Sequence, residues 1–300
     1  MLGGDSIEYY AHSENQQDEL HLLIDHLLGT AKLAGKFASK FNAKDIGYYT
    51  GLWHDLGKFS PEFQTYLLDQ AATRGPDHSS AGAIFALKFL EILAFPIAGH
   101  HTGLVDLQDL KQRLKNKGKD ARVNRSNEIA QAIVDRLTPS VTLSKCLPSQ
   151  IISRNASLEF FIRMVFSCLV DADYSDTERH FDYNTSILRG TEDTISYLHE
   201  LFTESYLKMT RAAEPSHLNS VRSEIYETCL LAAENKPGIF RLTVPTGGGK
   251  TLASMAFALH HAVLYNLDRV IVAIPYTSII EQTASVYKDI FGSNRVLEHH

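Results

Sequence analysis

The stretch "GLWHDLGKF" (residues 51–59) places His54 beside Asp55 inside an otherwise apolar helical run. A polar helix edge with a capping carboxylate would explain this pair, and so would two adjacent metal ligands. The pair alone does not decide between them, because His-Asp dipeptides are common. The decision depends on whether the rest of the chain supplies further ligands at suitable positions.

The composition is typical of a soluble globular protein. The 300 residues suffice for one large or two ordinary domains, and 44% of them are hydrophobic while 21% are charged. No uninterrupted apolar run is long enough to span a membrane, and the N-terminus lacks the basic start and apolar core of a secretory signal. The three cysteines, at 146, 168 and 229, have no CxxC spacing and fit a reducing compartment. We therefore expect a cytoplasmic protein, and its net charge of −6 gives no global indication of nucleic-acid binding.

The hydrophobic pattern predicts a mostly α protein with two domains. Residues 18–41 carry an apolar stripe at helical spacing, and similar patterns recur at 44–58, 79–94, 127–137, 157–174 and 187–210. We expect an all-helical domain over 1–210. Strands predicted at 238–244 and 269–275, on either side of a helix, would form a βαβ unit in a partial α/β domain over 215–300. The helical periodicity breaks near 205–220.

Candidate partners for His54 and Asp55 are spread over the helical domain. They are His26, His78, the vicinal pair His100 and His101, and either Asp171 or Asp173. A single histidine of this kind usually lies at a helix edge or in the core. Their occurrence together in one helical domain favours a metal site.

This order of residues resembles the HD superfamily of metal-dependent phosphohydrolases. More narrowly, "HDLGKFSPEFQ", the HH pair and "LVDADYSDTE" resemble the HD nuclease domain of the CRISPR-associated helicase-nuclease of type I systems. The resemblance implies that one ion is held by His26, His54, Asp55 and Asp173, and the other by Asp55, His78, His100 and His101. It favours Asp173 over Asp171, because the family's last ligand follows an alanine and precedes an aromatic residue or an arginine. His12 lies outside this core pattern but could approach the site.

The ligand types agree with two transition-metal ions. Imidazoles with a few carboxylates suit Mn, Fe, Co, Ni or Zn better than Mg or Ca. Seven ligands are too many for one tetrahedral ion, and the two oxygens of Asp55 make it the natural bridge and a catalytic candidate. Lys58 is a second catalytic candidate, which could contact a phosphate or could equally be a solvated lysine.

A second motif, "VPTGGGKTL" (residues 244–252), predicts a phosphate cradle. Thr246 and the glycines 247, 248 and 249 would expose backbone N–H groups, Lys250 would reach the β- and γ-phosphates of ATP, and Thr251 would coordinate Mg²⁺. Val244 replaces the first glycine of the full P-loop pattern. The form here, like "IPYTSIIEQ" further on, resembles a superfamily 2 helicase, and the resemblance extends over nearly the whole chain.

Three functions remain open at this stage. The first is a metal-dependent nuclease for single-stranded DNA joined to the start of a helicase, which by resemblance acts with a guide-RNA surveillance complex. The second is an HD phosphohydrolase of nucleotides, and the third is a recruitment module with an impaired metal site. The basic run at 110–125, with seven basic residues and one acidic residue, is by default a solvated loop and could otherwise steer a phosphate backbone.

Overall fold

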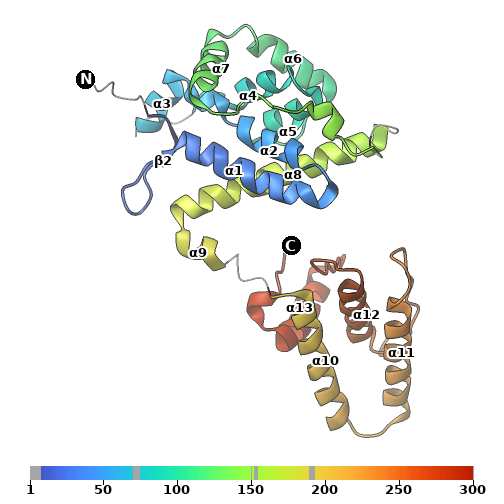
Figure 1. The fold of residues 1–300 in the computed structure, drawn as a ribbon. Helices are drawn as coiled ribbons and strands as arrows, with labels where there is room; N and C mark the ends of the chain where they lie inside the picture. Colours follow the sequence, from blue (N-terminus) through green and yellow to red (C-terminus); the bar gives the residue numbers. More distant parts are fainter. Residues whose placement is uncertain (1–7, 70–74, 150, 152–154, 189–192, 300) are drawn as a thin grey trace. The chain divides into compact units, whose positions relative to one another are not determined.

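A computed structural model describes residues 8–69, 75–149, 151, 155–188 and 193–299. The chain forms two compact units, Met1–Gly190 and Thr191–His300, and each is described by itself. Both are built mainly of helices, which confirms the mostly α fold class (Figure 1). None of the described helices is long and apolar enough to cross a membrane.

The first unit is a cluster of helices preceded by a short ribbon. The ribbon pairs β1 (Tyr10–His12) with β2 (His21–Leu22) in antiparallel fashion, and the helical patterns did not predict it. The α-helices are α1 (Leu23–Ala38), α2 (Lys44–Trp53), α3 (Pro61–Leu68), α4 (Ser79–Ala86), α5 (Ala94–Gly99), α6 (Leu107–Lys117), α7 (Ala121–Ile133), α8 (Asn155–Phe181) and α9 (Tyr183–Leu188). Short 3-10 turns are η1 (Ser39–Phe41), η2 (Leu56–Phe59), η3 (Glu91–Leu93) and η4 (Leu143–Cys146).

Helices α1, α2 and α8 of this unit pack against one another (Figure 1). The predicted stripe of α1 is buried, with Leu27 and Ala31 fully inaccessible. Gly51 lets α2 approach α1 closely, because a Cβ at this position would lie 2.8 Å from Ala31 Cα. Trp53, also fully buried, donates its indole N–H to the carbonyl of Leu137 at 3.0 Å. Burial of each large apolar side chain contributes about 1.5–3 kcal/mol, so this packing fixes the end of α2 where His54 follows.

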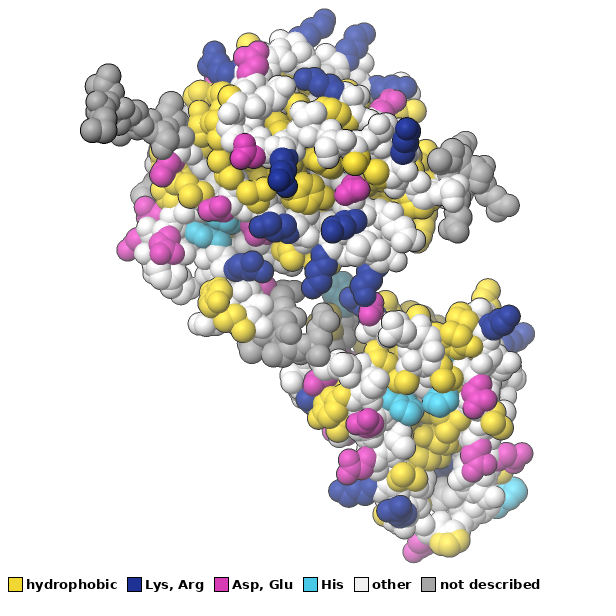
Figure 2. Space-filling view, in the orientation of Figure 1, with side chains coloured by type: hydrophobic (Ala, Val, Ile, Leu, Met, Phe, Trp, Pro, Cys, Tyr) yellow, Lys and Arg dark blue, Asp and Glu magenta, His cyan; other side chains and the backbone are white. Residues whose placement is uncertain are grey.

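The basic run at 110–125 is helical rather than a mobile loop. It forms most of α6 and the start of α7, because Asp106 and Asp120 cap the two helices with side-chain hydrogen bonds. Leu110 and Leu114, one turn apart, are buried beneath α6. Figure 2 shows Lys and Arg side chains at the surface of this unit.

The second unit contains α10 (Ile195–Ala212), α11 (His217–Ala233), α12 (Lys250–Leu264), α13 (Thr277–Phe291) and the turn η5 (Ser293–Arg295). Its core groups Phe202, Met255, Leu259, Tyr287 and Phe291. The expected helix break near 205–220 lies between α10 and α11. Helix α10 nevertheless belongs to this unit, because its Phe202 packs against α12 and α13.

The strands expected at 238–244 and 269–275 are not formed in the described residues. A strand requires a neighbour whose backbone groups pair with its own, and the structure pairs neither segment. Their apolar side chains are correspondingly open to solvent, with Ile271 83% exposed. Hydrophobic side chains are visible on the surface of this unit (Figure 2).

Candidate metal centre

Five separate segments of the first unit carry the seven predicted ligands to one place. His26 lies in α1, His54 and Asp55 follow α2, His78 precedes α4, and Asp173 lies in α8. The vicinal pair His100 and His101 directly follows α5. The potential ligand atoms fall into two groups around Asp55, in which all atoms of a group lie within 4.8 Å of one another.

The first group, His26, His54 and Asp173, meets Oδ2 of Asp55. His26 Nε2 lies 3.5 Å from Asp55 Oδ2 and 3.4 Å from Asp173 Oδ1. His54 Nε2 lies 3.3 Å and 3.6 Å from the same two oxygens. Asp171 is exposed on another face of α8, so only Asp173 of the two alternatives meets these histidines.

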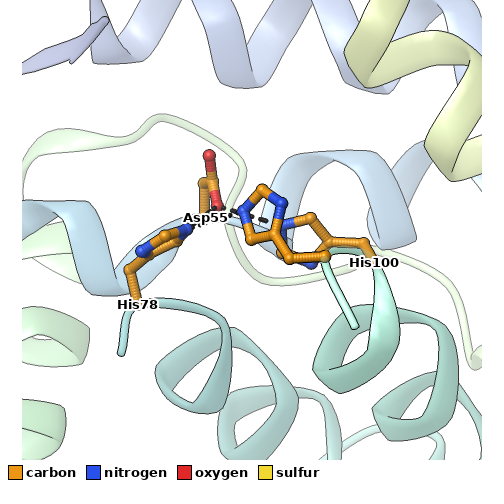
Figure 3. Close-up of side chains that lie close together, drawn as sticks. Asp55, His78 and His100 are labelled. Atoms are coloured by element: carbon orange, nitrogen blue, oxygen red, sulfur yellow. Dashed lines mark hydrogen bonds and ion pairs between the residues drawn. The ribbon is translucent and has the colours of Figure 1, made fainter. Parts of the chain in front are cut away.

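The second group, His78, His100 and His101, meets the other oxygen of Asp55. His78 Nε2 and His100 Nε2 lie 3.6 Å and 3.3 Å from Asp55 Oδ1, on two sides of the carboxylate (Figure 3). His101 Nε2 faces His78 Nε2 at 2.7 Å. Asp55 therefore presents one oxygen to each group, which is the arrangement expected of a bridging ligand.

Backbone carbonyls fix the orientation of three of these imidazoles. Nδ1 of His54 lies 2.7 Å from Gly51 O, that of His100 lies 2.7 Å from Ile97 O, and that of His78 lies 3.1 Å from Pro76 O. A carbonyl only accepts, so each Nδ1 carries a proton and each Nε2 is the nitrogen that faces Asp55. Orientation of a ligating histidine through its second nitrogen is the usual arrangement at metal centres.

The centre contains more acceptors than donors. Three buried atoms have no hydrogen-bond partner within the described part of the chain. They are the two carboxylate oxygens of Asp55 and Nε2 of His100. Lys58 Nζ forms an ion pair with Asp55 Oδ2 at 2.7 Å but reaches only that oxygen. Buried acceptors without donors are destabilising unless a cation satisfies them. The residues therefore fit divalent metal ions, and their nitrogen and oxygen donors suit transition metals.

The negative charges of Asp55 and Asp173 around the first group also favour a bound cation. Burial alone would lower the pKa of His54, but the carboxylates of Asp55 and Asp173 outweigh it and raise that pKa to about 10. Burial alone would raise the pKa of Asp55, yet the neighbouring charges of His54 and Lys58 hold it well below its usual range. The two carboxylates thus attract either a proton onto His54 or a metal ion in its place.

Burial favours the neutral form of two imidazoles of the second group. Burial lowers the pKa of His78, and it lowers the pKa of His101 to about 4. Neutral imidazoles are the form that binds metals, so burial favours the ligating form of these two histidines.

A glycine lets His78 lie close to Asp55. Gly57 donates its N–H to the carbonyl of His78 at 3.1 Å, and a Cβ on Gly57 would lie 2.2 Å from the same oxygen. Any other residue at 57 would push His78 away. The glycine of "HDLGK" is therefore part of the site's construction.

Lys58 is buried, unlike the solvated or phosphate-contacting lysine expected from the sequence. Its side chain is 5% exposed. Besides Asp55 it contacts the carbonyl of Ala11 at 3.0 Å, and its ammonium group lies over the ring of Phe63. Lys58 therefore ties Asp55 to strand β1.

Asp176 contacts a predicted ligand, and the sequence analysis did not single it out. Its Oδ2 lies 2.9 Å from His26 Nδ1, so it orients His26 as the carbonyls orient the other three. It follows Asp173 by three residues, which is the spacing that places two side chains on one face of a helix. Gly29 makes room for it, because a Cβ there would lie 2.0 Å from Asp176 Oδ1.

His12 and His21 extend the imidazole cluster beyond the predicted ligands. The ring of His12 stands edge-on to His26 at 4.8 Å and stacks with His21 at 5.5 Å. Burial lowers the pKa of His12 to about 2 and that of His21 to about 4. The ribbon β1–β2 thus lines the His26 side of the centre with neutral rings.

In the second unit, the glycine-rich segment turns sharply into α12. Gly247 and Gly249 have φ values of +87° and +79°, which favour glycine. A Cβ on Gly248 would lie 2.4 Å from the side chain of Val244. Lys250 and Thr251 are exposed in the first turn of α12, and Thr246 is exposed before it. This is the geometry of a loop leading into a helix N-terminus, which suits an anion.

Comparison with known proteins matched both parts of the chain. Residues 23–140 match the HD domain family, and residues 208–298 match the family described as type III restriction enzyme, res subunit. No curated protein matched the sequence.

Two solved structures are similar to the chain. The crystal structure of T. fusca Cas3-ADP shares 18% identity with a TM-score of 0.49, and that of T. fusca Cas3-ATP shares 16% with a TM-score of 0.45. The similarity covers 97% and 98% of this chain but only 38% of each of those chains. The two family matches fall on the two parts of the chain that the sequence analysis separates, an HD domain first and a type III restriction enzyme res subunit second.

Proposed function

We propose that the first unit is a metal-dependent phosphodiesterase that cleaves single-stranded DNA. The observation that carries this proposal is the convergence of two imidazole groups on the two oxygens of one buried carboxylate, of which Lys58 pairs with only one. His26, His54, Asp55 and Asp173 would hold one ion, and Asp55, His78, His100 and His101 the other. Such ions, when bound, lower the pKa of water and stabilise the charge of an in-line phosphoryl displacement.

The protein's own residues prepare this chemistry. Asp55 would hold the two ions at a fixed separation through its two oxygens. Lys58 keeps that carboxylate in place and ionised. The carbonyls behind His54, His78 and His100 keep each Nε2 directed at the centre, so the site is formed before a substrate arrives.

The helicase-type segment in the same chain favours a nucleic-acid substrate over a free nucleotide. A helicase delivers single strands, and a metal site recessed among helices accepts a flexible strand more readily than a duplex. We propose that the complete protein couples the nuclease to ATP-dependent unwinding, with ATP and Mg²⁺ at residues 246–251. The sequence motifs resemble those of the CRISPR-associated helicase-nuclease of type I systems. By this resemblance, the partner would be a guide-RNA surveillance complex in type I CRISPR interference.

The test is cleavage by metal-stripped protein with Mn²⁺, Fe²⁺, Co²⁺, Ni²⁺ or Zn²⁺ added back singly. Single-stranded DNA, duplex DNA and deoxynucleoside triphosphates would be supplied in parallel. We expect metal-dependent cleavage of the single strand and little turnover of the others. Preferential turnover of the triphosphates would establish the nucleotide phosphohydrolase instead.

A matched pair of variants guards against a contaminating nuclease. His54→Ala removes a predicted ligand, whereas His217→Ala removes an exposed histidine at the start of α11. Activity should disappear in the first variant and persist in the second. If elemental analysis finds no transition metal in wild-type protein after reloading, the recruitment module becomes the better account.

A further inference from the structure

Arg113 of α6 joins the two segments that carry the second group of histidines. Its Nη2 contacts Ser79 Oγ at 2.8 Å and Asp77 Oδ1 at 3.3 Å, and its Nε contacts Ser80 Oγ at 3.1 Å. These three partners flank His78. Its Nη1 donates to Ala98 O at 2.7 Å, two residues before His100.

These contacts occur in a largely buried setting. Ser79 and Ser80 are buried, and the side chains of Arg113 and Asp77 are 28% and 25% exposed. Asp77 also receives hydrogen bonds from Ser80 N and Ser80 Oγ, at 3.2 Å and 2.8 Å. A planar guanidinium with several fixed donors can hold such a set of partners, whereas a lysine cannot. The basic character of Arg113 is therefore used inside the fold, not for a phosphate backbone.

Among the described residues, no such contact links Arg113 to the first group of ligands. His26, His54 and Asp173 belong to α1, to the end of α2 and to α8, whereas the four hydrogen-bond partners of Arg113 named above are residues 77, 79, 80 and 98. Loss of Arg113 should therefore remove a hydrogen-bonded link between the segments of His78 and of His100–His101, while the contacts of the first group stay in place.

We propose that Arg113 is a positioning residue that assembles one of the two ion sites, the one formed by Asp55, His78, His100 and His101. This inference rests on the proposed two-ion function. Loss of a residue that supports the metal ligands without binding the metal typically weakens metal affinity by about 10–100-fold. Here the weaker affinity should be confined to one of the two ions.

The experiment is titration of metal-stripped protein with Co²⁺, followed by calorimetry and by the visible absorption of the bound ion. Wild-type protein should bind two equivalents. Arg113→Ala should bind one with wild-type affinity and the other at least about 10-fold more weakly. Arg122→Ala is the control for metal content, because it removes an arginine whose contacts are with Asp120 on the same helix start.

Each outcome decides the question. Two equivalents with unchanged affinity in Arg113→Ala would overturn the proposal, and so would equal weakening of both, which indicates a general loss of stability. If Arg113→Ala does not fold, Arg113→Lys gives the same comparison, since its single ammonium cannot reach both segments. A wild-type protein that binds no Co²⁺ refutes the two-ion function itself, which is a separate result.

Discussion

Gly29→Ala tests whether Asp176 supports the proposed metal binding at His26. In an ordinary helix this substitution stabilises by about 1 kcal/mol. Here the new Cβ would lie 2.0 Å from Asp176 Oδ1 and 2.8 Å from its Cγ. Non-bonded carbon and oxygen atoms separate by roughly 3.5 Å, so the carboxylate must retreat by about 1.5 Å. The 2.9 Å contact between Asp176 Oδ2 and His26 Nδ1 would then break.

We expect the affinity for the ion at His26 to fall by about 10–100-fold, with nuclease activity at limiting metal falling in parallel. Affinity would be measured by competition with a chromophoric chelator, and stability by thermal unfolding of the metal-free protein. Gly35→Ala is the matched control. It lies in the same helix, its Cβ would meet Lys44 O and Tyr48 Cβ at 3.3 Å, and it should leave the affinity unchanged. A Gly29→Ala protein with wild-type affinity and a higher melting temperature would refute the role of Asp176.

Three further predictions follow from the same geometry. Asp55→Asn should lower nuclease activity at least about 10²-fold and reduce bound metal, because the amide keeps only one ligating oxygen and no charge with which to bridge the two proposed ions; normal rates would contradict the bridge. Lys250→Ala should leave cleavage of single strands unchanged, and ATP turnover by this chain should not rise with added DNA; a DNA-stimulated ATPase abolished by that substitution would contradict this. The metal-free protein should lose stability as pH falls from about 6.5 toward 4, because His21 has a folded-state pKa of about 4 and an unfolded value near 6.5, so the unfolded chain binds more protons. In His21→Gln, thermal unfolding should depend less steeply on pH over that range, and an unchanged slope would contradict the assignment.

The helices and the ligand cluster could be predicted because their signals are local. The stripe of α1 and the order of His26, His54, Asp55 and the later histidines are readable along the chain. The roles of Asp176 and Arg113 were not readable, since each depends on which segments meet in three dimensions. Arg113 looked like part of a solvated basic run until its partners at residues 77–80 were known. The prediction of strands at 238–244 and 269–275 was wrong for a related reason. Strand formation depends on neighbouring strands, which local periodicity does not specify.

The four imidazoles with a fixed tautomer differ in how their orientation can be lost by mutation. For His54, His78 and His100 the orienting atom is a main-chain oxygen, of Gly51, Pro76 and Ile97 respectively. No side-chain substitution removes a main-chain oxygen. Substitutions at residues 51, 76 and 97 therefore leave the carbonyl that accepts the hydrogen bond from each histidine. His26 relies on a side-chain carboxylate. One substitution, at residue 176, can therefore remove the group that orients His26, and no single side-chain substitution does so for the other three histidines.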